Sequence, residues 1–443
     1  MGILLMVYIL GTIQLLLIIY ICFFEYKNKS SVLFLWVTLF IMFGMMHFVT
    51  PFLGSNFSNS VLNEASIFVI GFCFLYIITR KLFCLDKKKK HYEVFSSTNQ
   101  KRKKHNFLTA LLVLICAYMI IVVAKSQGGL MNSSWSGGRD YLMSKSYVSS
   151  DNMFGILYFA LGGIPLICII NKEYKNFLIC FISQFLVLFF TRNRVLMLPT
   201  VVSIIAFVIF KLKSKISLKV VVLALFGGFF VVYFVYAIRA FRWLGSLSDA
   251  ASIFSFSVIN ERVLEFIKTD NGELGLRNVF YTFIDNNNNY SGFNEMATYI
   301  RMLFVYIPTK FSFGLKPSDF AETMALALGG SEGGSMHPTL FGDCYANGGF
   351  LAFFLGILWG IIANIIDYVI GRIKHFDVKR LLYVLSACSF IVIGRGAVYN
   401  GFVNIAWGFL FLLIIYYLFL KNKDIHSYKL GGSYETCYSR SIL

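Results

Sequence analysis

The sequence predicts an all-α polytopic integral membrane protein with about eleven transmembrane helices and one large extracytoplasmic loop subdomain. Composition is the first indication, because 58% of the 443 residues are hydrophobic and only 14% are charged. A soluble core of this size does not hold so much apolar sequence. Spacing is the second indication, because the apolar residues gather in long runs. The expected spans are residues 3–24, 31–53, 64–82, 107–125, 152–170, 177–191, 195–210, 219–238, 348–370, 380–399 and 401–420.

The basic residues orient these spans. The positive-inside rule makes the basic segments cytoplasmic, which places the N-terminus outside. The first apolar run has no basic region before it, so we interpret it as a retained helix and not a signal peptide. The net charge of +18 is mostly such an orientation signal. The basic runs 87–90 and 101–104 indicate anchoring on an anionic inner leaflet, and no nucleic-acid-binding pattern accompanies them. The cytoplasmic segments are 25–30, 80–106, 171–176, 211–219, 371–380 and 421–443.

The chain divides into four predicted parts. Residues 1–238 hold the first eight helices, and residues 239–347 form the large extracytoplasmic loop. Residues 348–420 hold the last three helices, and residues 421–443 are a cytoplasmic tail. The large loop is too long for a connector, so we expect a folded cap. Interpreting 177–210 as a single span would put several lysine-rich segments outside, which favours two spans there.

A turn with two arginines, Arg192 and Arg194, separates the sixth and seventh spans. Each of these spans has about 15 residues and reaches roughly 23 Å, less than the roughly 30 Å of the hydrocarbon core. We therefore expect the turn below the outer membrane surface. Charge at that depth is costly and is typical of a functional site, here one that meets an anionic lipid headgroup.

More arginines are predicted on the outer side. Arg239 and Arg242 end the eighth span and share one helix face, and Arg395 lies between two glycines that let a headgroup approach. Arg139 lies in a second outer loop that is rich in glycine and serine. Any single arginine also fits snorkelling, in which its head only reaches the interface. The side that should be poor in positive charge thus carries a group of arginines that together favour recognition of phosphate, and these are Arg192, Arg194, Arg239, Arg242 and Arg395. Arg139 is a further candidate for substrate binding.

Two histidines, His47 and His337, are expected on the outer side. His47 lies within the second span, where helix packing is the simpler role. His337 precedes the ninth span and has Asp343 and Tyr345 within one or two turns. Imidazole titrates near neutral pH, so His337 is a candidate general base. Asp343 would orient it or bind sugar and Tyr345 would bind substrate; a structural histidine beside Pro338 is the alternative.

We expect no cofactor and no metal. The sequence has no Asp-x-Asp motif, no dense carboxylate cluster and no Cys-x-x-Cys pair. Cys344, the cysteine expected in an outer loop, lacks the pattern that would support a nucleophile. Fixed arginines can neutralise a pyrophosphate leaving group without a metal.

The large loop contains Ile307-Pro-Thr-Lys310, Lys316-Pro317, Ser335-Met-His337-Pro and Gly342-Asp343-x-Tyr345-x-Asn347-x-Gly349. With the layout of the spans, this stretch resembles the O-antigen polymerases, also called oligosaccharide repeat-unit polymerases. The related O-antigen ligases share the plan, with outer arginines and a loop histidine. By position, His337 matches that histidine, and the Arg192/Arg194 and Arg239/Arg242 pairs match the arginine sites.

The resemblance implies a glycosyltransferase of the bacterial cytoplasmic (inner) membrane whose active site faces outside. Its substrates would be undecaprenyl-pyrophosphate-linked glycans, which it would polymerise into O antigen or a similar surface polysaccharide. The resemblance also implies a chain-length regulator protein as a partner, besides the lipid bilayer.

Other functions stay open. An O-antigen ligase would pass the glycan to a different acceptor, although Lys316-Pro317 and the stretch around Asp343 favour a polymerase. A polysaccharide flippase or transporter would need ionisable residues at mid-membrane and internal repeats, which the sequence does not show. A dolichol-type glycosyltransferase would need acids in the first outer loop, where residues 54–65 offer only Glu64.

Overall fold

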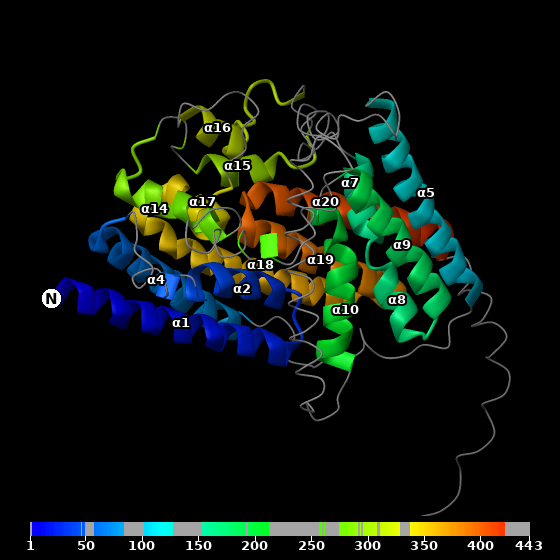
Figure 1. Ribbon diagram of the computed structural model, residues 1–443, viewed down its shortest axis with the longest axis horizontal. Coiled ribbons are helices and arrows are strands. Elements are labelled where there is room, and N and C mark those ends of the chain that lie inside the picture. The colour runs from blue at the N-terminus through cyan, green and yellow to red at the C-terminus, as the bar shows by residue number, and fades with distance from the viewer. Residues whose placement is uncertain are drawn as a thin grey trace, which may run out of the picture.

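The structure is a computed structural model that describes residues 2–45, 47–48, 57–83, 102–126, 153–191, 194–211, 257–258, 261, 274–290, 293, 296–307, 311–327 and 337–420. This described part is helical and contains no strand (Figure 1). Its first helices are α1 (Gly2–Asn28), α2 (Leu33–Leu39), η1 (Phe40–Met45), α4 (Asn59–Leu82), α5 (Arg102–Ser126), α7 (Met153–Leu161), α8 (Ile164–Ile170), α9 (Tyr174–Thr191), η3 (Arg194–Met197) and α10 (Leu198–Lys211). The later ones are η4 (Leu274–Arg277), α14 (Asn278–Asp285), α15 (Ala297–Leu303), α16 (Phe320–Ala327), α17 (Thr339–Gly348), η6 (Gly349–Phe354), α18 (Leu355–Arg372), α19 (Phe376–Arg395), α20 (Val398–Ile415) and η7 (Tyr416–Leu420).

These helices confirm a multi-pass membrane protein. Each predicted span overlaps a described helix except 219–238, which lies outside the described residues. One helical run begins already at Thr339, inside the predicted loop, and the total of about eleven spans stays a prediction. Among the described residues, six runs are long and apolar enough to cross a membrane: Leu5–Asn28, Asn59–Leu82, His105–Val122, Met153–Ile170, Thr339–Arg372 and Val398–Phe419. Three apolar helices are shorter: Leu33–Met45, Tyr174–Phe190 and Val195–Phe210.

Buried ionic networks mark one end of the bundle, called the ion-pair end below. Arg80 near the end of α4 contacts Glu25 of α1 at 2.5 Å and Asp367 of α18 at 2.6 Å. Arg80 also donates to the side-chain oxygen of Asn364 at 2.5 Å. Because both carboxylates and the guanidinium are paired, the charges are tolerated away from water. A second network joins α5, the turn before α9 and the start of α19 through His105, Glu173, Asp377 and Arg380.

The predicted arginine turn joins two separate helices. α9 begins at the ion-pair end, where Asn176 donates to Asn106 of α5 at 2.8 Å. α10 ends there as well, because the ring of Phe210 contacts Tyr383 in the first part of α19. α9 and α10 therefore form a hairpin of two antiparallel helices, as predicted, and Arg194 begins η3 at its tip.

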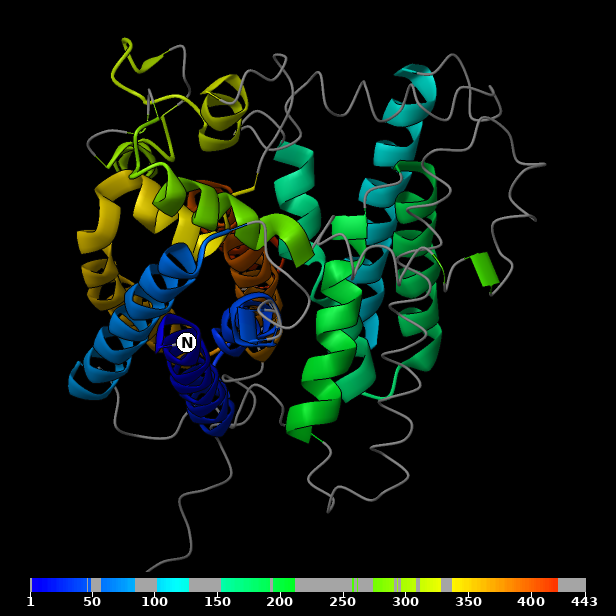
Figure 2. The same ribbon diagram turned by 60° about the vertical axis from the view of Figure 1, so that its left-hand side comes forward.

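Two apolar clusters hold the bundle together, one on each side of α19. The first packs α1, α2 and α4 against α14, α17 and α18, and the second packs α5, α7, α8, α9 and α10 against α19 (Figures 1 and 2). Between α4 and α18 the backbones approach closely. A Cβ on Gly356 would lie 2.4 Å from the carbonyl oxygen of Phe72, and one on Gly360 would lie 2.7 Å from Cβ of Thr79. Small residues are what allow such contact between membrane helices.

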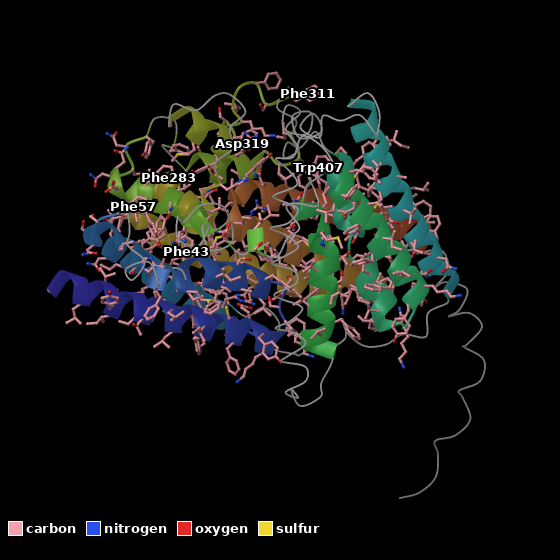
Figure 3. All side chains as sticks on the ribbon, in the orientation of Figure 1. Phe43, Phe57, Phe283, Phe311, Asp319 and Trp407 are labelled. Carbon is pink, nitrogen blue, oxygen red and sulfur yellow. The ribbon has the colours of Figure 1, made fainter. Side chains whose placement is uncertain are left out.

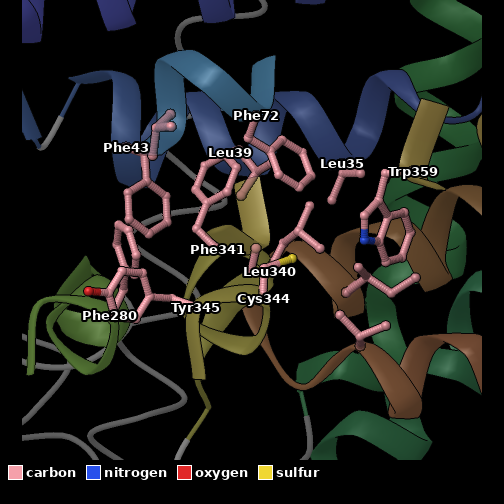
Figure 4. Packing of buried hydrophobic residues seen from close by; sticks show 14 of the residues in the cluster. Leu35, Leu39, Phe43, Phe72, Phe280, Leu340, Phe341, Cys344, Tyr345 and Trp359 are labelled. Carbon is pink, nitrogen blue, oxygen red and sulfur yellow. The ribbon is translucent and has the colours of Figure 1, made fainter. Parts of the chain in front are cut away.

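The short helices α14 to α17 lie at the other end of α4 and α18, called the site end below. In both ribbon views α15 and α16 lie over α17 and α20 (Figures 1 and 2). α17 is inserted among its neighbours. The ring of Phe341 packs edge-on against Phe43 and Phe72, and Phe280 of α14 lies on the same cluster (Figure 4). This packing anchors the segment that carries the candidate site.

We expect Gly356→Ala to destabilise the bundle, because its Cβ would overlap a backbone oxygen of α4 that cannot move independently. Overpacking of this kind typically costs about 1–3 kcal/mol. Thermal unfolding of the purified protein in detergent measures the effect. The matched control is Gly371→Ala near the end of the same helix, where a Cβ meets nothing within 4 Å. Equal melting temperatures for the two variants would contradict the close approach.

Candidate active site

His337 lies immediately before α17 and packs against the turn between α19 and α20. A Cβ on Gly396, which ends α19, would lie 3.4 Å from Nδ1 of His337, so the imidazole sits close to the backbone there. This nitrogen is buried and has no hydrogen-bond partner among the described residues. Arg395 is the last residue of α19, and its charge acts on the His337 ring. The structure therefore brings together two predicted site residues, His337 and Arg395, that are far apart in the sequence.

Burial lowers the pKa of His337, and the positive charge of Arg395 lowers it further, to about 4. The imidazole is therefore neutral at pH 7 and keeps a lone pair that can accept a proton. It is also a weaker base than an exposed histidine. An anion bound to Arg395 would offset the guanidinium charge and raise the pKa of His337 again.

Asp343 on α17 holds the α19–α20 turn. Its carboxylate is fully buried, and Oδ2 accepts a hydrogen bond from the backbone N–H of Val398, the first residue of α20, at 2.8 Å. Oδ1 accepts from the side-chain amide of Asn347 at 2.9 Å, and the oxygen of that amide accepts from the backbone N–H of Thr298 on α15. A side-chain oxygen that accepts from an N–H in the first turn of a helix satisfies a donor that has no partner within that helix. Asp343 therefore ties α17 and α15 to the turn against which His337 packs.

Tyr345 lies on a different face of α17. Positions two apart on a helix are separated by about 200°, so Asp343 and Tyr345 point to opposite sides. The Tyr345 hydroxyl donates to the carboxylate of Glu64 on α4 at 2.6 Å. Its ring packs edge-on against Phe68 and Phe280 (Figure 4). A role of Tyr345 in substrate binding stays a prediction, and the structure places it away from the face that carries Asp343.

Two cations that sequence analysis did not single out as site residues lie over Tyr399. The guanidinium carbon of Arg301 on α15 is 4.5 Å from the centre of the Tyr399 ring, and Nζ of Lys316 is 5.7 Å from it. Both distances fit cation–π contacts. Nε of Arg301 is buried and has no hydrogen-bond partner in the part of the chain that the structure describes. Tyr399 belongs to the first turn of α20, so these cations flank the segment that follows Arg395.

His47 has a structural role. Its Nδ1 lies 2.6 Å from the hydroxyl of Tyr281, and its Nε2 lies 2.8 Å from Oγ of Ser66. The ring is buried, and both nitrogens are engaged. His47 therefore joins the end of η1 to α4 and α14, which agrees with the expected role in helix packing.

Several predicted site residues lie outside the described residues, so their distances to His337 stay predictions. Arg194 begins η3 at the tip of the α9–α10 hairpin, and only its backbone is described. The predicted site arginines that lie wholly outside the described residues are Arg139, Arg192, Arg239 and Arg242.

Comparison with known proteins gives no family assignment. No protein-family model matches the chain, and neither a curated protein nor a solved structure matches it. The function is therefore argued from the site itself. Its described residues provide a neutral imidazole, a guanidinium on the neighbouring turn and two further cations on adjoining segments. Such an arrangement is suited to a reaction in which an anionic group is bound and another group loses a proton.

We expect His337 to remain uncharged between about pH 5 and about pH 8, because its pKa lies near 4. Nitrogen NMR of labelled histidine side chains in nanodiscs measures this. Arg395→Gln removes one of the two causes, so the pKa should rise toward, but not reach, its ordinary value of 6.5. The control is Arg372→Gln, an exposed arginine at the ion-pair end, which should leave the titration unchanged. A pKa near 6.5 in the unaltered protein would contradict the burial of His337.

Proposed function

We propose that the protein is a metal-independent glycosyltransferase that polymerises undecaprenyl-pyrophosphate-linked repeat units, as O-antigen polymerases do. The observation that carries the proposal is the neutral His337 imidazole, which packs against Gly396 and has the charge of the preceding Arg395 acting on it, at one end of a membrane bundle. A guanidinium is suited to a pyrophosphate, and a neutral imidazole is suited to a sugar hydroxyl. The resemblance of the stretch from Ile307 to Gly349 to that family supports the same function.

The reaction follows from these two groups. The bond between the anomeric carbon of the donor glycan and its pyrophosphate oxygen breaks, and that oxygen keeps the electron pair. A hydroxyl on the non-reducing sugar of another lipid-linked unit forms the new glycosidic bond, and its proton passes to the His337 imidazole. Arg395 stabilises the charge that develops on the leaving pyrophosphate. The bound pyrophosphate also raises the basicity of His337, because it offsets the charge that lowers the pKa.

The other residues take supporting roles in this proposal. Asp343 is a positioning residue, because it holds the segment after Arg395 through the amide of Val398. Arg301 and Lys316 supply positive charge beside the same segment. Phosphate binding is further assigned to Arg192, Arg194, Arg239 and Arg242, and Arg139 and Tyr345 are assigned to substrate binding.

The site end faces the outside in this proposal, across a bacterial inner membrane with about eleven spans. Basic residues in the last turns of several helices support the orientation. Lys27 ends α1, Arg80 and Lys81 end α4, and Arg372 ends α18. α1, α4 and α18 end close together, because the Arg80 network joins them. The positive-inside rule makes that end cytoplasmic, so the opposite end with His337 meets the outer leaflet, where the large loop would cover it.

His337→Ala should leave single repeat units in place of long chains, because the acceptor hydroxyl then has no base. Loss of a general base typically lowers a rate by about 10²–10⁴-fold. Purified protein in vesicles, supplied with lipid-pyrophosphate-linked repeat units, gives the rate from the chain lengths on a gel. The matched control is His47→Gln, a second buried histidine at the site end, which should polymerise normally once protein levels are equal. Normal chains from His337→Ala would refute the assignment.

Arg395→Ala should also abolish long chains while the protein still inserts, since a charge-assisted contact to pyrophosphate contributes about 1.5–3 kcal/mol or more in a shielded site. Arg395→Lys should rescue only in part, because a lysine loses the two-pronged geometry. The control Arg372→Ala removes an exposed arginine from the ion-pair end and should have no effect. Normal chain lengths from Arg395→Ala would show that the side chain of Arg395 only reaches the membrane interface and does not bind the substrate. Transfer of glycan to an acceptor other than a lipid-linked unit would show that the protein is a ligase.

A further inference from the structure

The segment between α15 and α16 exposes an unusual number of large apolar side chains. Leu303 is 80% exposed, Phe313 is 90% exposed, and Phe311 and Leu315 are each 69% exposed. Tyr306 and Ile307 are exposed as well. A contiguous apolar patch of this kind marks a surface that binds a membrane or another protein. We call the described residues 303–307 and 311–315 the apolar hairpin.

Two cationic side chains close the base of the apolar hairpin. Nζ of Lys316 donates to the carbonyl oxygen of Ile307 at 3.0 Å, which joins the two described parts of the apolar hairpin. Arg301 donates to the carbonyl oxygen of Pro317. At the tip, Phe313 has a φ of 49° and Gly314 a φ of 78°, which turns the chain back. The hairpin thus has an exposed apolar tip and a base that is held by cations, of which Lys316 is buried. Exposed apolar groups on such a tip are suited to the acyl region of a bilayer.

The position of the apolar hairpin along α20 connects it to a membrane span. The indole N–H of Trp407 donates to the carbonyl oxygen of Val305 at 2.9 Å, and the Tyr306 hydroxyl donates to the carbonyl oxygen of Ala406 at 3.1 Å. α20 begins at Val398, so these contacts lie roughly 12 Å along the helix. The helix belongs to the candidate span Val398–Phe419. Figure 3 shows Phe311 at the edge of the molecule, beyond Trp407.

The apolar side of α20 continues the surface of the hairpin. Ile414, Tyr417, Leu418 and Phe419 at the far part of the same span are also exposed, as expected for a lipid-facing helix. Tyr306 and Trp407, whose ring centres lie 5.3 Å apart, are residue types enriched at the membrane–water interface. An apolar surface that adjoins the side of a span has acyl chains as its nearest neighbours.

We propose that the apolar hairpin inserts into the bilayer beside α20 and that its partner is the acyl chains of the surrounding lipids. Large aromatic and aliphatic side chains leave water on insertion, and Lys316 and Arg301 then lie at the level of the lipid phosphates. This anchoring does not depend on glycosyl transfer. If the proposed function also holds, the hairpin fixes the cations over Tyr399 at the depth where a lipid-linked pyrophosphate lies.

Photocrosslinking in vesicles of phosphatidylethanolamine and phosphatidylglycerol tests the proposal. The photoreactive residue p-benzoylphenylalanine replaces Phe313 in one variant and Phe311 in another, and mass spectrometry identifies the adducts. Both positions are exposed, so the substitutions should not disturb folding. The matched control carries the same residue at Ser318, an exposed polar position just beyond the cationic base. Circular dichroism and gel filtration of each variant check that the fold is intact.

Phospholipid adducts at 311 and 313 that exceed those at 318 several-fold are the expected result. A crosslink from 313 to a second copy of the chain would overturn the proposal, because the patch would then be a protein interface. Lipid adducts no more frequent than at 318 would overturn it too, because the tip would then lie in water. The outcome is separate from polymerisation, which the same variants report in the gel assay.

Discussion

The hydrogen bond from the Val398 backbone amide to the buried Asp343 carboxylate is the constraint on which the site depends. It joins α17, which follows His337, to the first residue of α20, which follows Arg395 and Gly396. The apolar cluster packs these two segments together, and this hydrogen bond adds a specific polar contact between them. A hydrogen bond of this kind contributes about 0.5–1.5 kcal/mol, and a buried group left without its partner costs about 1–3 kcal/mol. Asp343 thus helps to hold the segments that carry His337 and Arg395. In the proposed reaction it contacts neither the pyrophosphate nor the imidazole that acts as the base.

The two ends of the bundle use charge differently. At the ion-pair end Arg80 is satisfied by Glu25 and Asp367, which locks α1, α4 and α18 together. At the site end the charge of Arg395 does not form part of such a network with His337. It lowers the pKa of the His337 imidazole instead. The Arg80 guanidinium is balanced by carboxylates and therefore has little attraction left for a substrate. This difference favours the site end as the place of chemistry.

Periodicity and charge were sufficient to predict the helical membrane fold and the hairpin around Arg194, because long apolar runs have few other stable structures in lipid. Proximity in sequence was a poor guide within the site. Asp343 and Tyr345 are two positions apart, yet a helix turns them to opposite faces. Arg301 and Tyr399 are far apart in sequence and meet only through tertiary packing, so nothing local in the sequence could indicate the contact. The sequence could not indicate the ion-pair end for the same reason, because its charges belong to six different helices or turns.

The most direct test of the account is a double-mutant cycle for His337→Ala and Arg395→Ala, measured as kcat/KM for polymerisation of lipid-pyrophosphate-linked units by the purified protein. If the imidazole and the guanidinium act on one transition state, the double variant should lose less than the sum of the two single losses, with an interaction energy of about 0.5–3 kcal/mol. A cycle in which the two losses simply add would show that the residues act independently, and it would contradict a shared site at the α17–α19 contact.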